Sequence, residues 1–204
     1  MTVTQISDGR GVKKHIHIDG EYSFTVDGEY LLKCGIFVGE ELTEEKIEEI
    51  KAGYEKHCAQ KRALGLLSRR SHSAKELRTK LMTRTSAENA DAVVEKMKDY
   101  GYVDDERFAE IYADELWERK LFSQSRIRRE LILKGIDRDT ADSVVEKYEC
   151  DEKERIREII ESRYYLKLST EKGRRSLFAL LVRLGYSYGD IRASFGEYDD
   201  LYEE

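Results

Sequence analysis

Proline is absent from the 204-residue sequence, in which about ten prolines would be expected at average usage. Because proline interrupts helices, its absence favours long helices joined by glycine and polar turns, and it excludes a proline-rich linker or a collagen-like segment. Long apolar runs are also missing, since the longest, at 177–182, is far shorter than the roughly 18 residues of a membrane-spanning helix. We therefore expect no membrane partner.

Cysteine is scarce, and Cys34, Cys58 and Cys150 are odd in number and widely separated. This pattern argues against a disulfide framework and favours the reducing cytoplasm. Residues 1–10 lack the basic start and the apolar stretch of a signal peptide. The sequence also has no phosphate-binding glycine loop, nucleophile elbow or zinc-protease motif, so we predict a protein that is not an enzyme and uses no cofactor.

Histidine offers little for a metal site. His15 and His17 fall on one face of an expected strand and could ligate a metal, but no cysteine or acidic partner follows at a structural spacing. His57 and Cys58 are adjacent, so on a helix their side chains diverge by about 100°, and we expect Cys58 to be a core residue. No metal site is predicted.

What the first part of the chain does contain is strand periodicity. Apolar and polar side chains alternate in two runs, 15–18 and 22–26, that are separated by Asp19-Gly20. Asp-Gly tolerates the positive φ values of a type I′ turn, so the pattern predicts a β-hairpin. Residues 3–6 are a candidate third strand, and Asp27-Gly28 ends the second run. We expect a small β-rich cap over residues 1 to about 40.

From Thr43 onward the apolar period becomes helical, with Thr43 as the expected N-cap of the first helix. Glycines suited to the C′ position of a helix recur at Gly101, Gly135 and Gly185. Helix-start signals also recur, namely Ser73-x-x-Glu76, Thr85-x-x-Glu88, Ser187-x-x-Asp190, Asp104 and Asp137.

The helical part repeats itself. A shift of 50 residues places the segment 73–81 on 123–131, a second such shift reaches Leu177 and Leu181, and Gly135 falls on Gly185. A shift of 51 places 90–96 on 141–147, where six of the seven residues are identical. Each unit contains three helical stretches: 57–70, 74–83 and 87–100; 105–121, 124–134 and 138–149; 151–167, 171–184 and 188–195.

These observations predict a mainly α fold of three tandem three-helix repeats that stack into an elongated, curved array, with a small N-terminal β-rich cap. The expected parts are 1–56, a cap containing the β-hairpin plus an acidic helix; 57–103, repeat 1; 104–150, repeat 2; 151–196, repeat 3; and 197–204, an acidic tail.

The net charge of −6 conceals three basic windows, 69–84, 119–135 and 163–185, each with six basic residues against one acidic residue. Taken singly, such a window is a solvated helix face. Recurrence in every repeat instead predicts a stripe that faces a polyanion or an acidic protein groove. The candidate contact residues are Arg69, Arg70, Lys75, Arg78, Lys80, Arg119, Lys120, Arg126, Arg128, Arg129, Lys134, Arg174, Arg175 and Arg183.

Three runs carry a family resemblance: ALGLLSRRSHSAKEL at 63–77, GYVDDERFA at 101–109 and IRRELILKGI at 127–136. Over about residues 57–195 the chain resembles the RecX regulatory family, and its β-rich start is similar to the N-terminal extension of Gram-positive-type members. The third unit departs most, with Gly173 in place of serine, Phe178 in place of arginine, and no Ala-Asp-x-Val-Val motif.

The resemblance implies tandem three-helix repeats that lie along the groove of the RecA filament on single-stranded DNA. It implies inhibition of filament extension, ATP hydrolysis and strand exchange, in homologous recombination, DNA repair and the SOS response. The partners expected from it are RecA and, as a weaker or indirect partner, single- or double-stranded DNA, with the protein itself a monomer. The alternative is a non-enzymatic, nucleic-acid-binding helical-repeat protein whose effect on RecA is competition for DNA.

The junction 101–109 has two interpretations. In the structural one, Gly101 ends a helix, Asp104 caps the next and Phe108 is core, so no binding role is needed. In the minority hypothesis, Tyr102, Asp105 and Arg107 contact a partner.

Overall fold

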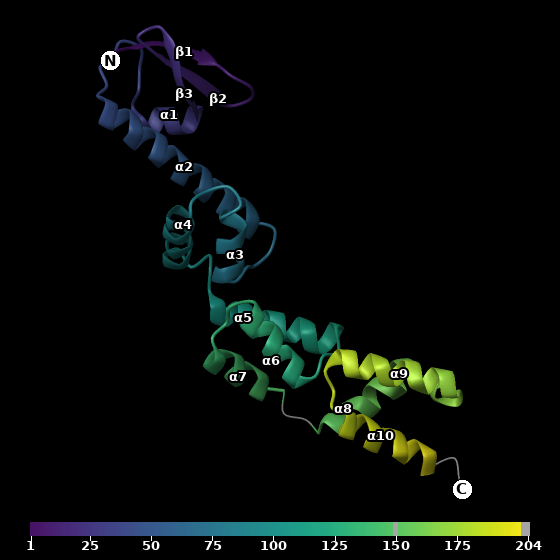
Figure 1. Cartoon of the computed structure of the whole chain (residues 1–204). Helices are drawn as coiled ribbons and strands as arrows, with labels where there is room; N and C mark the ends of the chain where they lie inside the picture. The colour runs from purple at the N-terminus through teal and green to yellow at the C-terminus, as the bar shows by residue number, and fades with distance from the viewer. Residues whose placement is uncertain (149–150, 201–204) are drawn as a thin grey trace. The chain divides into compact units, whose positions relative to one another are not determined.

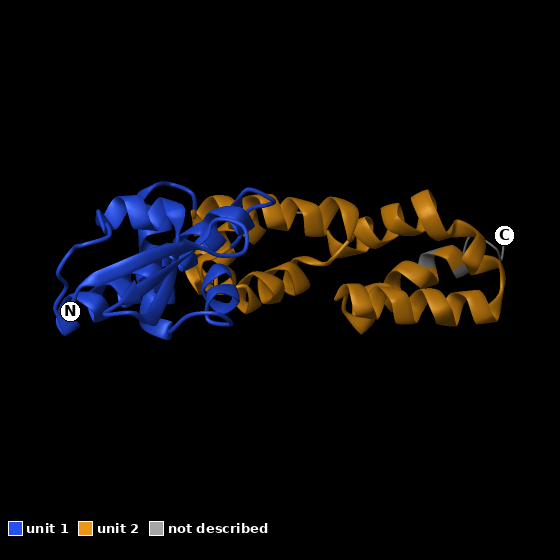
Figure 2. Cartoon of the chain, turned by 90° about the horizontal axis from the view of Figure 1, so that it is seen from above, with its two compact units in different colours: residues 1–72, 77–102 blue, residues 73–76, 103–204 orange. Residues whose placement is uncertain are grey.

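The computed structural model describes residues 1–148 and 151–200 (Figure 1). Cys150 and the last four residues of the expected acidic tail lie outside the described residues. The chain divides into two compact units, one of residues 1–72 and 77–102 and the other of residues 73–76 and 103–204 (Figure 2). The predicted class is confirmed, since helices dominate and the strands form one small N-terminal sheet.

The sheet has three antiparallel strands, β1 (Val3–Asp8), β2 (Lys13–Ile18) and β3 (Glu21–Asp27), in that order. The predicted turn is present, with φ of 50° at Asp19 and 89° at Gly20, as a type I′ turn requires. One face of the sheet is buried through Ile16, Phe24 and Val26, which pack with residues of the following helices. The alternation in the sequence therefore identified the strands and most of their buried face; the exception is Tyr22, which is 60% exposed.

Two helices follow the sheet, α1 (Gly28–Cys34) and α2 (Glu44–Leu67). The short α1 was not expected: Asp27 ends β3 and also caps α1, accepting a hydrogen bond from the backbone N of Tyr30 at 2.8 Å. Thr43 caps α2 as predicted. Because α2 continues unbroken across residues 56 and 57, the expected boundary between the cap and repeat 1 falls inside a helix.

Repeat 1 combines the end of α2 with α3 (Ala74–Leu81) and α4 (Ala87–Asp99). The start signal for α4 was placed one residue too early. Ser86, with an extended backbone, accepts the hydrogen bond from the backbone N of Asn89, whereas the Thr85 hydroxyl is buried and has no hydrogen-bond partner among the described residues. The turn after α3 uses one more residue than the Thr-x-x-Glu spacing indicates.

Repeat 2 contains α5 (Asp105–Asp114), the π-helical turn η1 (Glu115–Arg119), α6 (Gln124–Leu133) and α7 (Arg138–Glu146). Asp104 and Asp137 cap α5 and α7 as predicted. Repeat 3 contains α8 (Glu152–Ile159), the π-helical turn η2 (Ile160–Tyr164), the 3₁₀ turn η3 (Tyr165–Ser169), α9 (Glu171–Leu184) and α10 (Tyr188–Asp200). In both repeats the first helix thus passes into a π-helical turn.

The second helix of each repeat carries the centre of its core. Leu77, Ile127 and Leu177 are fully buried at equivalent positions, as are Leu81, Leu131 and Leu181 four residues later. The residues between them are half-buried or exposed, so each of these helices buries one stripe, as the helical period predicted. No described helix is both long enough and apolar enough to cross a membrane.

Three helices end in the same way, namely α4, the third helix of repeat 1, and the second helices α6 and α9 of repeats 2 and 3. Gly101, Gly135 and Gly185 have φ of 70°, 92° and 100°. After each glycine the next backbone N–H returns to a carbonyl of the preceding helix, as in the hydrogen bond from Ile136 N to Leu131 O at 3.1 Å. This is the Schellman geometry, which L side chains rarely adopt, so the three predicted C′ glycines are confirmed.

Candidate partner-binding surface

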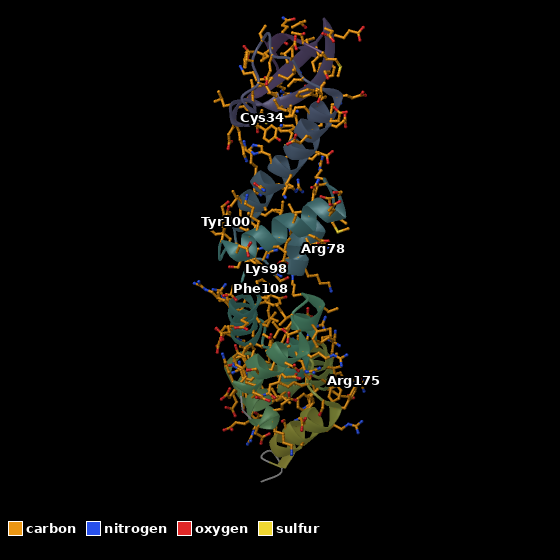
Figure 3. All side chains as sticks on the ribbon, turned by 90° about the vertical axis from the view of Figure 1, so that its left-hand side faces the viewer. Cys34, Arg78, Lys98, Tyr100, Phe108 and Arg175 are labelled. Carbon is orange, nitrogen blue, oxygen red and sulfur yellow. The ribbon has the colours of Figure 1, made fainter. Side chains whose placement is uncertain are left out.

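The most similar segments of repeats 1 and 2 hold an internal ion pair. Arg78 of α3 donates through Nε and Nη2 to the two carboxylate oxygens of Asp91 in α4, and Arg128 of α6 does the same to Asp142 in α7. Arg78 is labelled in Figure 3. The hydrogen bonds from the arginines hold the pKa of both carboxyls below the ordinary value of 3.8. The repeated Ala-Asp-x-Val-Val motif therefore supplies the aspartate of a fork-shaped pair inside each repeat.

Several other predicted contact residues also have partners inside the protein. The ring of Phe122 lies 3.8 Å from the guanidinium of Arg126, and Lys134 donates to Glu76 at 3.2 Å. The other partners are Ser71 O for Arg70, Leu133 O for Lys75, Leu168 O for Arg174 and Glu171 for Arg175. Much of the basic character of the second helices therefore serves packing and capping.

A second group of the predicted cations has no partner among the described residues. We call them the unpaired cations: Arg69, Lys80, Arg119, Lys120, Arg129 and Arg183. All are exposed except Lys80, which is half-buried. Arg69 and Arg119 stand at equivalent positions, 50 residues apart, just before α3 and α6. These side chains are the ones that keep both their charge and their donors available for another molecule.

The junction residues have distinct environments. The Oδ1 atom of Asp105 accepts a hydrogen bond from the backbone N of Ala74 at 2.8 Å and so caps the first turn of α3. Tyr102 is 57% exposed and packs edge to face on Tyr100, whereas the exposed Arg107 has no side-chain partner among the described residues. Asp105 thus has a structural role that accounts for its place in the motif, while contact roles for Tyr102 and Arg107 stay predictions.

The same junction recurs one repeat later. Glu152, the first residue of α8, accepts from the backbone N of Gln124 at the start of α6, just as Asp105 does for α3. Burial, and next the negative charge of Asp190, raises the pKa of Glu152 above its ordinary value of 4.5. The acidic residue that begins the first helix of one repeat therefore caps the second helix of the repeat before it. Asp105 was predicted to belong to the N-terminus of its own helix or, in the minority hypothesis, to contact a partner, and Glu152 was given no role, so this partner was missed.

Near these caps, within the second unit, backbone segments of consecutive repeats lie very close to each other. The Ser73 hydroxyl donates to Lys134 O at 2.6 Å, and Ser123 N donates to Leu184 O at 2.9 Å. A Cβ atom on Gly135 would lie 2.5 Å from Lys75 Cβ, and one on Gly185 would lie 2.5 Å from Arg126 Cβ. The serines and glycines that repeat at a spacing of 50 therefore form the contacts between consecutive repeats.

The described residues contain one group with metal-ligand character, Asp27, Glu29 and His57, whose ligand atoms lie within 4.8 Å of one another. Lys61 Nζ already donates to Asp27 at 3.1 Å and to Glu29 at 3.0 Å, so an ammonium group balances these carboxylates. The prediction for Cys58 is wrong: it is exposed, and the buried neighbour is His57, which packs 5.1 Å from the Tyr30 ring.

Fold and site together define a protein in which a small antiparallel sheet is followed along the chain by tandem three-helix repeats with basic second helices. Sequence comparison matches the first three-helix domain of RecX to residues 59–97 and the second to 104–145. A protein named Regulatory protein RecX from Caldanaerobacter subterraneus subsp. tengcongensis is 35% identical over 167 residues, 80% of this chain and 84% of that protein. The chain belongs to the RecX family of regulatory proteins.

Other relatives agree. Regulatory protein RecX from Listeria monocytogenes serotype 4b is 36% identical over 72% of this chain, although the match spans only 56% of that longer protein. A crystal structure of regulatory protein RecX has a TM-score of 0.65 at 21% identity, covering 96% of this chain and 98% of its own. The structure of RecX from Lactobacillus salivarius gives 0.56 over 71% and 97%. At these identities the structures support the fold.

Proposed function

We propose that this protein binds the RecA nucleoprotein filament in the cytoplasm and inhibits its ATPase, strand-exchange and filament-extension activities during recombination and repair. The observation that carries the proposal is membership of the RecX family, at 35% identity over 80% of the chain. The proteins that match are named as regulators, and a regulator acts through a partner.

The unpaired cations support the proposal and indicate how the contact is made. They recur in all three repeats and therefore offer several separate contacts to a partner that is itself repetitive. Each exposed ionic contact is weak, but contacts linked on one chain act together because the first raises the effective concentration of the next. A filament of identical protomers is a partner of this kind.

The decisive measurement is the RecA ATPase on single-stranded DNA at increasing concentrations of this protein, with its DNA binding measured in parallel. We expect inhibition at ratios far below those that coat the DNA. An ATPase that is unchanged at near-equimolar protein contradicts the proposal.

Charge-reversal variants locate the contact. Changing the unpaired cations of repeat 2, with Arg119→Glu, Lys120→Glu and Arg129→Glu, should weaken inhibition strongly. A control with the same change in net charge is Lys13→Glu, Lys33→Glu and Lys56→Glu, three exposed lysines outside the second helices. Equal losses in both variants would show that overall charge, rather than this surface, governs the effect.

The same cations favour one alternative, in which the protein binds DNA and competes with RecA for it. Arginine and lysine neutralise phosphates and release counterions, so such binding weakens steeply with salt. Tight binding to DNA without RecA, together with ATPase inhibition only at coating ratios, would support this alternative.

A further inference from the structure

Repeat 3 lacks the internal ion pair of the other two repeats, because neither of the two residues that form the pair is present. The position of Arg78 and Arg128 is taken by Phe178, 50 residues beyond Arg128. Asp91 and Asp142 each lie five residues after the N-cap of their helix, α4 and α7. In repeat 3 the residue five positions after the capping Ser187 is Arg192. Both positions of the ion pair therefore hold a different residue in repeat 3, and another set of side-chain contacts takes the place of the pair.

The replacement is an aromatic cluster. The Phe178 ring lies 5.4 Å from that of Tyr188 and 6.1 Å from that of Phe195, the second pair edge to face. Phe195 stands where the other repeats have valine, at Val94 and Val145. Phe178 and Phe195 are only half-buried, and Tyr188 is 62% exposed. Aromatic surface thus reaches solvent where repeats 1 and 2 present a closed ion pair.

Phe178 and Phe195 form the walls of a surface pocket of about 300 Å³ whose other lining residues are Arg174 and Arg175. Arg174 Nε donates to Leu168 O at 2.9 Å, a contact that holds this guanidinium beside the rings. Arg175, labelled in Figure 3, pairs with Glu171 through two side chains that are each 79% exposed. An exposed pair of this kind is weak, so Arg175 can turn to another anion.

The lining selects a ligand that is flat and apolar in one part and anionic in another. Neither lining phenylalanine offers a hydrogen-bond donor or acceptor, and both arginines offer only donors. A nucleotide in a single strand combines the two features, because its base stacks on aromatic rings while its phosphate binds guanidinium groups. A duplex keeps its bases stacked inside, so their faces are not available to the pocket.

We propose that this pocket binds one unpaired base of single-stranded DNA, with the base against Phe178 and Phe195 and the neighbouring phosphate on Arg174 and Arg175. The site does not depend on RecA, because the pocket and the ligand account for the contact by themselves. Repeat 3 would thus contact its ligand partly by stacking, whereas the unpaired cations make only ionic contacts.

The test uses the full chain and measures its affinity for a labelled single-stranded oligothymidylate, without RecA, by fluorescence anisotropy. Phe178→Leu keeps the packing volume apolar but removes the ring, and we expect the Kd to rise about tenfold, a typical loss for one stacked base. Phe37→Leu is the matched control, since Phe37 is 62% exposed and lies outside the repeats; its Kd should not change. Equal Kd values for Phe178→Leu and the unmodified protein would overturn the proposal.

A second variant and a second ligand sharpen the result. Phe178→Arg with Arg192→Asp restores the ion pair of repeats 1 and 2, so the fold should be kept, as judged by circular dichroism, while the Kd again rises about tenfold. An abasic oligonucleotide should bind the unmodified protein as weakly as oligothymidylate binds Phe178→Leu. Equal binding of abasic and normal strands, together with tighter binding of an acidic peptide with aromatic side chains than of oligothymidylate, would assign the pocket to a protein partner instead.

The RecA ATPase separates this proposal from the proposed function. If Phe178→Leu loses DNA affinity and still inhibits RecA, the pocket stands and is separate from the RecA contact. If it keeps DNA affinity, the pocket fails whatever the ATPase shows.

Discussion

Repeats 1 and 2 differ from repeat 3 at the two positions of their internal ion pair, while the fully buried positions of the second helix agree in all three. The fully buried leucine and isoleucine residues of the second helix occur in each repeat, and the glycine after that helix occurs in repeats 2 and 3, where repeat 1 has Thr85. The half-buried position beside them carries Arg78 and Arg128 in two repeats and Phe178 in the third. Stability and surface chemistry are therefore set by different residues on the same helix.

The comparison also explains why the repeats look alike in sequence. Arg78 with Asp91, and Arg128 with Asp142, satisfy each other inside a repeat, so their recurrence reflects structure more than binding. Repeat 3 is free of that constraint.

The largest effect is expected at the helix-ending glycines. Gly185→Ala forces an L side chain into φ of 100° and brings its Cβ to 2.5 Å from Arg126 Cβ and Ser123 Oγ. Left-handed strain and overpacking together should cost roughly 3 kcal/mol of unfolding free energy, measured by urea denaturation. Gly135→Ala should behave similarly, because Lys75 Cβ lies equally close.

Gly101→Ala is the internal control. Its φ of 70° is also positive, but a Cβ there meets nothing within 4 Å. The cost should be about 1 kcal/mol, the strain alone. Equal costs at all three glycines would mean that the close approach between repeats contributes nothing.

A smaller effect is expected at the junction. Asp105→Ala removes the carboxylate that accepts from Ala74 N, and the loss should be about 1 kcal/mol, typical of a helix cap. Arg107→Ala changes an exposed side chain of the same helix and should leave the urea midpoint unchanged. Inhibition of RecA that falls with Asp105→Ala only as far as stability falls would assign Asp105 a structural role alone.

Placing the residues of repeat 3 into repeat 2 tests whether the two kinds of repeat differ only at these surface positions. Arg128→Phe with Asp142→Arg gives repeat 2 the exposed residues of repeat 3, and because both positions lie at the surface the melting temperature should change by less than about 2 °C. The graft should not create a base pocket, because Gln124 and Ser125 stand where repeat 3 has Arg174 and Arg175. Improved binding of oligothymidylate by the graft would show that aromatic surface alone is sufficient.

Much of the fold was predictable because its signals are local. The Asp19-Gly20 turn, the apolar period of each helix and the glycine after it depend on neighbours within a few residues. The short helix α1 escaped prediction because its one buried residue, Tyr30, is held by α2, where its hydroxyl donates to Ile50 O, 20 residues away. The start of α4 was misplaced because either Thr85 or Ser86 can cap a helix, and packing decides between them.

The candidate surface was less predictable, for a related reason. The sequence counts basic residues, but it does not say which of them already have partners. Arg128 meets Asp142 across 14 positions and Lys134 meets Glu76 across 58, so only the fold separates these from Arg129 and Lys120. The stripe predicted from composition therefore becomes a smaller set of unpaired cations.

The smallest predicted effect compares two carboxyl groups with opposite shifts in pKa. Burial, and next Asp190, raises the pKa of Glu152 above 4.5, so its ionised form destabilises the fold and that cost appears as the pH rises through the raised pKa. The hydrogen bond from Arg128 lowers the pKa of Asp142 below 3.8, so its ionised form stabilises the fold and that gain is lost as the pH falls through the lowered pKa.

Neutral substitutions should therefore act in opposite directions. At pH 7, Glu152→Gln keeps an acceptor for Gln124 N, removes the unfavourable charge and should raise the urea midpoint slightly, whereas Asp142→Asn should lower it. Near pH 4 the difference between Glu152→Gln and the unmodified protein should shrink, because Glu152 is by then largely protonated. A lower midpoint for Glu152→Gln at pH 7 would mean that the charged cap on α6 outweighs the burial of the carboxylate, and that the two repeat junctions owe their stability to charge rather than to packing.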